Sequence, residues 1–275
     1  REGLPPEVNF MVGRVGDIET SAELQHLALA DGRRVTARLL VVATGLGDVI
    51  RRQLGIEKRV VSAAHSLSFG FDFKGTRADF PFPSLVWYID RPADQGAYLS
   101  VFPIKDRLRA NLFTYRRMAD PWVKAFRQAP KETLTATLPG LARAVGDFEV
   151  VGRVQMWLMD LSVARHVEQA GVVLIGDAYQ TSSPAAGTGV SRLLTDIEQL
   201  CGTYVPAWFA TPGMGADKIA AFYGDADKRA MDAHALALAR YRRSLTVDVS
   251  PAWQVRRQIA YARRHLINGL DRVSP

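Results

Sequence analysis

The most constraining feature of this sequence is an apolar run that ends in glycine and aspartate and leads into a glycine-rich loop. Residues 171–177 read Gly-Val-Val-Leu-Ile-Gly-Asp, and the loop that follows ends in Gly187-Thr188-Gly189. A short continuous apolar run beside glycine is typical of a strand buried in a parallel sheet. An aspartate directly after such a strand lies at the sheet edge where α/β proteins bind ligands. We therefore expect an α/β unit with a ligand site near Asp177.

The loop and helix after this strand suit a planar ligand that carries negative charge. Gly187 and Gly189 stand one residue apart and let the backbone approach a ligand closely. A helix beginning near Thr188 directs free N–H groups and the positive end of its dipole toward that ligand. Asp177 is able to accept hydrogen bonds from polyol hydroxyls. The alternative is a plain strand–turn–helix with a capping aspartate, and the residue pattern alone leaves both open.

A second apolar run has the same character and lies near the start of the chain. It covers residues 38–45 and ends in Thr44-Gly45, and we expect another buried, parallel strand there. Neighbouring patterns indicate a meander of short strands over residues 8–29 and a hairpin turn at residues 31–32. A short helix is expected over residues 48–54.

The middle of the chain, residues 61–165, follows a different pattern. A helical stretch over about residues 121–141 contains Pro130 and Pro139, and short strand-like runs surround it. Those runs lie at residues 66–73, 85–89, 97–102, 108–115 and 150–158. We predict an antiparallel sheet with a helix packed against it, inserted between the two α/β segments.

The last part of the chain is predicted to be helical. After the glycine-rich loop we expect one helix over residues 188–201, a long helix over 215–245 and another over 252–268. The last of these has Val255, Ile259, Ala262 and Leu266 on one face and arginines on the other. We expect it to pack on its own protein with a solvated arginine face. Peripheral contact with an anionic membrane is the alternative.

Composition narrows the class of protein. The 275 residues carry a formal net charge of +7, but the 35 Lys and Arg residues are spread along the chain. We therefore expect a small-molecule substrate and no nucleic acid. Cys201 is the only cysteine, which excludes a disulfide within the chain and fits the cytoplasm. Its apolar helical surroundings place it in the core. The sequence indicates no oligomeric state.

Several catalytic motifs are absent from the 275 residues. There is no Walker A loop, no His-Glu-x-x-His, no Gly-x-Ser-x-Gly and no pair of zinc-binding cysteines. The five histidines lack the spacing of metal ligands, so no metal site is expected. We keep His65 as a site candidate because it lies near a crossing between the predicted domains. Asp160, Arg165 and His166 follow a predicted strand, where a solvated turn is favoured over a place at the mouth of an active site.

The order of the motifs around Asp177 resembles that of a known family. Gly176-Asp177-Ala178, Pro184, the Gly187-x-Gly189 loop and Asp196 on the next helix are similar to a signature of the p-hydroxybenzoate-hydroxylase-like flavoproteins. The resemblance implies that Asp177 contacts the ribityl chain of FAD. It also implies that the loop from Pro184 lies along the isoalloxazine ring, near its pyrimidine edge.

Residues 31–56 resemble the second fingerprint of the same family, with two departures. Thr44 stands where the family usually has Asp, and Asp48 stands where it often has Ser. After Asp177, Tyr179 and Gln180 replace the common Ala-His. No Gly-x-Gly-x-x-Gly follows a strand in these 275 residues, so the loop that holds the ADP part of FAD is expected upstream of the first residue, with about a hundred residues around it.

The resemblance implies a fold, a domain order and a set of cofactor residues. The fold is α/β with an α+β insert: a partial doubly wound FAD-binding domain interrupted by an antiparallel sheet substrate domain and followed by helices. The four segments are residues 1–60 (FAD-binding domain), 61–165 (substrate domain), 166–202 (FAD-binding domain, return) and 203–275 (C-terminal helices). The implied cofactor-binding residues are Gly176, Asp177, Pro184, Gly187, Thr188, Gly189, Thr44 and Gly45.

The activity implied by the resemblance is that of an FAD-dependent oxidoreductase. NAD(P)H would reduce the FAD, and a flavin hydroperoxide would hydroxylate an aromatic or quinone-like small molecule. In this family the sheet domain carries one wall of the substrate pocket, so one or two of its aromatic residues are expected to face substrate; these are Trp87, Tyr98, Phe102, Phe113 and Trp157. Two alternatives stay open: a reductase or cyclase of the same fold acting on an isoprenoid, and a non-catalytic fragment or binding module.

Overall fold

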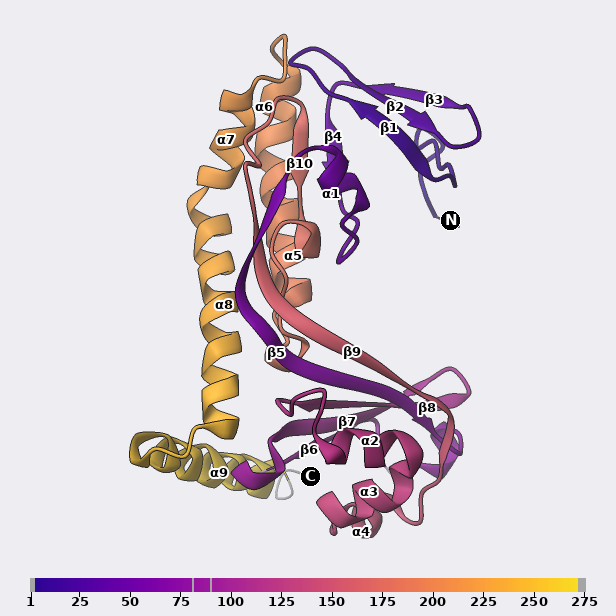
Figure 1. Ribbon diagram of the computed structural model, residues 1–275, viewed down its shortest axis with the longest axis vertical. Helices are drawn as coiled ribbons and strands as arrows, with labels where there is room; N and C mark the ends of the chain where they lie inside the picture. The colour runs from indigo at the N-terminus through magenta and orange to yellow at the C-terminus, as the bar shows by residue number, and fades with distance from the viewer. Residues whose placement is uncertain (1–2, 81, 90, 272–275) are drawn as a thin grey trace. The chain divides into compact units, whose positions relative to one another are not determined.

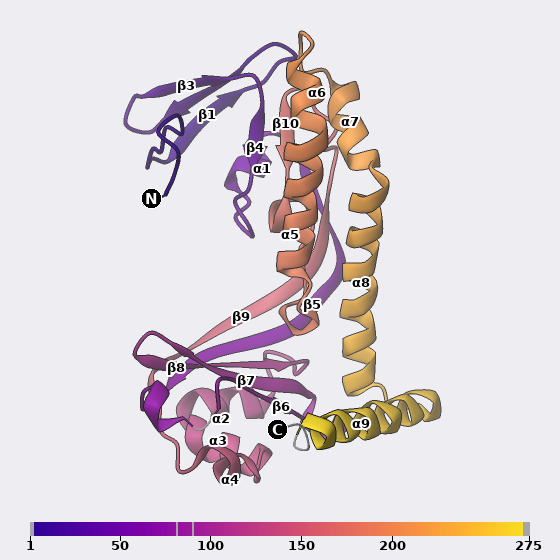
Figure 2. The same ribbon diagram turned by 180° about the vertical axis from the view of Figure 1, so that it is seen from behind.

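The structure is a computed structural model that describes residues 3–80, 82–89 and 91–271. The chain divides into two compact units (Figures 1 and 2). Unit 1 comprises residues 1–59, 162–181 and 189–233, and unit 2 comprises residues 60–161, 182–188 and 234–275. The chain passes through each unit three times, so each unit is built from segments that are distant in the sequence. The four-segment division predicted from the sequence stays a proposal.

Unit 1 opens with a meander that begins at Val15, so the strand expected near residues 8–12 is wrong. Its three antiparallel strands lie in sequence order, and they are β1 (Val15–Glu19), β2 (Gln25–Leu29) and β3 (Arg34–Ala37). The turn between β2 and β3 uses Asp31-Gly32, as predicted. Gly32 adopts φ +87°, and Arg33 donates its backbone N–H to Asp31 at 3.2 Å.

The two apolar runs form a parallel pair, as predicted. They are β4 (Leu40–Val42) and β10 (Val172–Leu174), and Leu174 lies opposite Val42. All three residues of β10 are fully buried, in a core that also contains Trp208 and Phe222 of two later helices. β4 differs from the expectation at Val41, whose side chain is 40% exposed. Side chains alternate between the two faces of a strand, so one face of β4 is open.

Helices form the rest of unit 1. After α1 (Val49–Gln53) they are α5 (Gly189–Ile197), a π-helical segment (Glu198–Tyr204), α6 (Val205–Phe209), α7 (Ala216–Gly224) and the first two turns of α8 (Ala226–Val247). The single long helix predicted over residues 215–245 is wrong, because the chain breaks at Asp225. Its backbone adopts ψ 135°, and its carboxylate accepts the N–H of Lys228 at 2.9 Å and caps α8.

The prediction that Cys201 lies in the core is also wrong. Cys201 is exposed, within the π-helical segment that continues α5. Only Leu200 of that segment is buried, because the wider helical turn directs a single side chain toward the core.

Unit 2 is built on the predicted antiparallel sheet. Its five strands run in the order β6-β7-β8-β5-β9. They are β5 (Glu57–Phe73), β6 (Leu85–Tyr88), β7 (Gly96–Ile104), β8 (Arg107–Thr114) and β9 (Val150–Arg165). The pairs β6-β7, β7-β8 and β8-β5 are antiparallel. β7 and β8 form the hairpin expected from their sequences.

Three short helices cover one face of this sheet (Figure 1). They are α2 (Pro121–Gln128), α3 (Pro130–Thr137) and α4 (Leu141–Val145). The two prolines divide the helical stretch predicted over residues 121–141, since proline cannot donate a helical hydrogen bond but suits the first turn. Phe126 of α2 is fully buried and stacks edge-on against Phe69 and Phe71 of β5, at 5.0 and 5.5 Å.

β9 is longer than predicted. It runs through Asp160 to Arg165, so Asp160 lies inside a strand, and the expectation of a turn there is wrong. In unit 1 the end of β9 is bonded to the segment after β10: Ala164 donates its backbone N–H to the Tyr179 carbonyl at 2.7 Å. In unit 2 the Asp160 carboxylate accepts the N–H of Ala64, which adopts φ +44° on β5.

The last helix, α9 (Pro251–Asp271), is oriented opposite to the expectation within unit 2. Ile259 and Leu266 of its apolar face are 61% and 70% exposed. Two arginines of its basic face pack instead: Arg257 donates to the carbonyls of Leu245 and Asp248, and Arg264 lies 4.3 Å from the ring of Tyr88. Long arginine side chains can cover apolar surface while their guanidinium groups bind carbonyls, which a hydrophobicity pattern does not reveal. Among the described residues, no helix has the length and apolar character needed to cross a membrane.

The packing in unit 2 generates a stability prediction. Replacing Phe126→Ala should lower the free energy of unfolding by about 3–5 kcal/mol, because it removes a buried ring from between α2 and β5. Lys124 is exposed on the same helix, so Lys124→Ala should change it by less than about 0.5 kcal/mol. Urea unfolding of both variants measures the difference, and similar losses in the two would contradict this packing.

Candidate active site

Two predicted cofactor segments meet at one edge of the parallel pair in unit 1. β4 and β10 run in the same direction, so the residues after them emerge at the same edge. Thr44 and Gly45 follow β4, and Gly176 and Asp177 follow β10. Gly45 and Gly176 adopt φ +61° and +58°, which glycine tolerates and most residues do not. The hydroxyl of Thr44 donates to the carbonyl of Gly47 at 3.2 Å and so closes its own loop.

Asp177 lies in a single 3₁₀ turn (Gly176–Ala178) that ends β10. Its side chain is 35% exposed. Tyr179 and Gln180 donate their backbone N–H groups to the Gly176 carbonyl at 3.0 and 3.1 Å, which fixes the turn. One guanidinium nitrogen of Arg192 lies 3.4 Å from the Asp177 carboxylate. The structure thus places a partly exposed carboxylate directly after β10, at the carboxyl end of the parallel pair.

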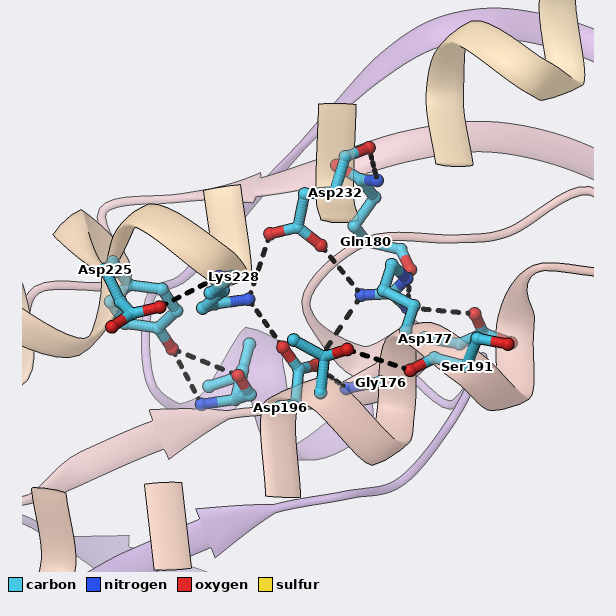
Figure 3. Close-up of polar contacts among 12 residues, drawn as sticks. Gly176, Asp177, Gln180, Ser191, Asp196, Asp225, Lys228 and Asp232 are labelled. Atoms are coloured by element: carbon cyan, nitrogen blue, oxygen red, sulfur yellow. Dashed lines mark hydrogen bonds and ion pairs between the residues drawn. The ribbon is translucent and has the colours of Figure 1, made fainter. Parts of the chain in front are cut away.

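Behind this turn lies a group of buried charges that the sequence reading missed. Figure 3 shows Asp196, Lys228 and Asp232 pointing toward one another. The ammonium group of Lys228 lies 2.8 Å from Asp196 and 3.0 Å from Asp232. Asp196 also accepts the backbone N–H of Gly176 at 2.8 Å. Two sequence signals were available: Arg192 and Asp196 stand four residues apart on α5, as Lys228 and Asp232 do on α8.

Two tyrosines complete the surroundings of Lys228 in unit 1. The Lys228 ammonium lies 4.1 Å from the centre of the Tyr179 ring, a cation–π contact. Burial raises the pKa of Tyr179 to about 12, with the carboxylates of Asp232 and Asp196 adding to the effect. Tyr223 hydrogen-bonds the backbone N–H of Leu174 at 2.8 Å, and burial raises its pKa as well. Both phenols are therefore neutral at pH 7.

The loop after this turn contains the other predicted cofactor residues. Pro184 begins a 3₁₀ turn (Pro184–Ala186), and Gly187 after it adopts φ +72°. Pro184, Gly187 and Thr188 belong to unit 2, whereas Gly189 begins α5 in unit 1.

Two hydroxyls of this loop lack a protein partner. Those of Ser183 and Thr188 are buried and make no hydrogen bond to the part of the chain that the structure describes. A Cβ added at Gly187 would meet no atom within 4 Å. Buried hydroxyls without a partner are costly unless something else satisfies them.

Comparison with protein families identifies the family of this chain. The model of the FAD binding domain family matches residues 16–203, from β1 to the end of the helix after the loop. The chain belongs to the FAD-binding domain family. The match covers both fingerprints and the sheet between them, so the family resemblance drawn from the sequence is confirmed.

Two curated relatives are hydroxylases. The chain is 26% identical over 189 residues to aklavinone 12-hydroxylase of Streptomyces peucetius, across 66% of this chain and 37% of that protein. It is 28% identical over 182 residues to the aklavinone 12-hydroxylase of Streptomyces peucetius subsp. caesius, across 64% and 35% of the two chains. The chain therefore spans little more than a third of the length of these relatives.

Solved structures confirm the fold. Anhydrotetracycline hydroxylase from Streptomyces rimosus superposes with a TM-score of 0.61 at 21% identity, covering 92% of this chain and 49% of that one. Klebsiella pneumoniae HpxO, complexed with FAD and uric acid, gives 0.63 at 16% identity and covers 94% and 64%. A Diels-Alderase of pyrroindomycin biosynthesis gives 0.65 at 18% identity and covers 91% and 52%. These identities show a shared fold and not a shared reaction.

The residues present fit a flavin cofactor. A carboxylate at the sheet edge suits polyol hydroxyls, and the buried hydroxyls of Ser183 and Thr188 require a polar partner. The open space at Gly187 allows a close backbone approach. The family match and these features agree, while the roles of the individual residues remain predictions.

The remaining aromatic candidates divide between the two faces of the sheet in unit 2. Trp87 is half-buried: it packs against the core formed with the helices, and it also lines an open pocket of unit 2 together with Tyr88 and Arg143. Tyr98 and Phe113 contact each other at 4.8 Å between ring centres, and Trp157 is 46% exposed on β9. Phe102 of β7 is half-buried. Trp87, Tyr98, Phe102, Phe113 and Trp157 all stay candidates for contact with substrate.

His65, kept as a candidate from the sequence, is a buried neutral residue of unit 2. Its side chain is 1% exposed and contacts the ring of Tyr115 edge-on at 5.9 Å. Its Nδ1 lies 3.1 Å from the Ser62 hydroxyl. Burial, together with the positive charge of Arg243, lowers the pKa of His65 to about 4. A histidine with so low a pKa is uncharged near neutral pH.

His65 should therefore make unit 2 sensitive to acid. The unfolded chain binds a proton at His65 below about pH 6.5, but the folded chain does so only below about pH 4. Lowering the pH through this window should reduce the free energy of unfolding by roughly 3 kcal/mol.

The measurement is urea unfolding at pH 7, 5.5 and 4 for wild type and His65→Phe, which keeps an aromatic ring beside Tyr115. Other groups also titrate here, so the quantity of interest is the difference between the two pH profiles. Identical profiles would contradict a buried, neutral His65.

Proposed function

We propose that this chain forms part of an FAD-dependent monooxygenase that hydroxylates an aromatic or quinone-like small molecule. The observation that carries the proposal is the Gly176-Asp177 turn after the buried strand β10, within a chain whose residues 16–203 match the FAD binding domain family. The names of two relatives, hydroxylases of aklavinone and anhydrotetracycline, support a fused-ring substrate. The cytoplasmic location expected from the sequence stays part of this proposal.

The chain's own residues would hold and orient the flavin. Asp177 would accept hydrogen bonds from the ribityl hydroxyls, with Thr44 and Gly45 at the same edge of the parallel pair. The N–H groups at the start of α5, from Gly189 onward, would stabilise negative charge on the ring. When bound and reduced by NAD(P)H, FAD supplies the activation of oxygen, and the protein supplies position and electrostatics.

Oxygen incorporation tests the reaction itself. The natural-length protein, supplied with FAD, NAD(P)H and a panel of polycyclic phenols and quinones, should consume oxygen faster with a substrate than without one. Under ¹⁸O₂ the product should gain one labelled oxygen atom. Conversion of substrate to an unlabelled isomer without oxygen uptake would favour a cyclase, the activity named for the Diels-Alderase of the same fold.

A substitution at Gly187 should affect both the stability of the fold and the binding of FAD. A β-branched side chain at φ +72° is strained, so Gly187→Val should destabilise the fold by about 1–2 kcal/mol. It should also fill the open space beside the loop and weaken FAD binding at least tenfold, measured by quenching of flavin fluorescence.

Gly152 provides a matched control on β9. It also adopts φ +72° with open space around it, so Gly152→Val carries similar strain. This variant should lose stability to a similar extent and keep its affinity for FAD. Equal loss of FAD affinity in both variants would show that the Gly187 effect is only a consequence of strain.

A further inference from the structure

Four charged side chains form a closed group in the interior of unit 1. Arg192, Lys228 and Asp196 are each 1% exposed, and the side chain of Asp232 is 11% exposed. Two cations face two carboxylates, so the group is neutral. Burying charges costs free energy that their mutual attraction often does not recover, so a buried network of this size is weak evidence for stability alone. Its position behind the Gly-Asp turn indicates a different role.

Arg192 links this group to the partly exposed Asp177. One of its terminal nitrogens lies 3.4 Å from the Asp177 carboxylate and also donates to the Gln180 carbonyl. The other terminal nitrogen lies 3.3 Å from Asp232 and 3.7 Å from Asp196. The planar fork of arginine permits such divided contacts, which the single ammonium group of lysine does not reproduce.

Lys228 holds the opposite side of the group. It binds one oxygen of Asp196 at 2.8 Å, while the other oxygen of Asp196 accepts the backbone N–H of Gly176 at 2.8 Å. Both residues of the Gly-Asp turn are therefore held from behind. Asp196 fixes the backbone of Gly176, and Arg192 fixes the side chain of Asp177.

We propose that Arg192 is a positioning residue that orients the Asp177 carboxylate toward the polyol chain of a flavin. The inference rests on the proposed function for the identity of the ligand. It goes beyond it in assigning the orientation to a buried arginine anchored by Asp232 and Asp196. Asp177 is more exposed than the four buried charged side chains behind it, so its carboxylate carries the charge of the network toward the surface of unit 1.

Carboxyl footprinting tests the position of Asp177 without any flavin. The natural-length protein is treated with a carbodiimide and glycine ethyl ester, and the labelling of each carboxylate is followed by mass spectrometry. In Arg192→Lys the labelling rate of Asp177 should rise at least threefold over wild type. The exposed Asp147 in unit 2 serves as the internal standard. An unchanged rate at Asp177 would overturn the proposal.

The matched control is Arg229→Lys. Arg229 is exposed on α8 beside Lys228, and the same substitution there leaves the Arg192–Asp177 contact in place. Its labelling pattern should equal that of wild type. A rise at Asp177 in this control as large as in Arg192→Lys would also overturn the proposal, because it would reflect general loosening of the unit.

A double-mutant cycle then connects position to cofactor binding. FAD dissociation constants are measured for wild type, Arg192→Lys, Asp177→Asn and the double variant. Arg192→Lys should weaken binding at least fivefold on its own and less than twofold when Asp177 is already Asn. Independent, multiplicative effects would overturn a role through Asp177. A wild-type protein that binds no FAD would refute the proposed function, while footprinting would still decide the position of Asp177.

A second measurement covers the case in which Arg192→Lys does not fold. Asp177→Asn changes a partly exposed side chain, so this variant should stay folded. Hydrogen exchange at the Arg192 guanidinium, followed by nuclear magnetic resonance, should be at least threefold faster in Asp177→Asn than in wild type. Equal exchange rates would show that Arg192 does not hold Asp177, and would overturn the proposal.

Discussion

The contact between the Asp196 carboxylate and the backbone N–H of Gly176 is the interaction on which the site depends. It ties the first helix after the loop to the end of β10, and so sets the direction in which the chain leaves the sheet. The carboxylate is buried and needs a cation, which Lys228 supplies from α8. Removing one partner of such a pair costs about 3–5 kcal/mol, because a charge is left uncompensated in the interior. The side chain of Asp196 on α5 thereby couples the end of β10 to α8.

The elements around this contact were predictable because they carry local signals. The apolar run of β10 ends in Gly176-Asp177, and the glycine-rich loop after it marks the start of α5. Parallel pairing with β4 follows from two such runs in one chain. The hairpin of unit 2 was equally clear from alternation and a short turn. In each case the signal lies in a local sequence pattern, read from one stretch of the chain or from two stretches of the same kind.

The buried charges were not predictable in the same way. Each helix shows an i, i+4 pair that is usual on a solvated surface, as with Lys228 and Asp232. Only the fold reveals that the pairs on α5 and α8 face each other. The prediction of the buried face of α9 was wrong for a related reason. An apolar stripe predicts a buried face, yet Arg257 and Arg264 form the packed contacts in unit 2. Asp160 likewise joins a strand because its pairing partners are distant in the sequence.

The central claim is that the Gly-Asp turn and its loop form part of a flavin site, and the visible absorption spectrum of the natural-length protein tests it most directly. The account predicts the two bands of oxidised flavin in the protein as purified, or after incubation with FAD, and predicts that they remain with the protein through desalting. A colourless protein that takes up no added FAD, although it is folded by circular dichroism, would contradict the account.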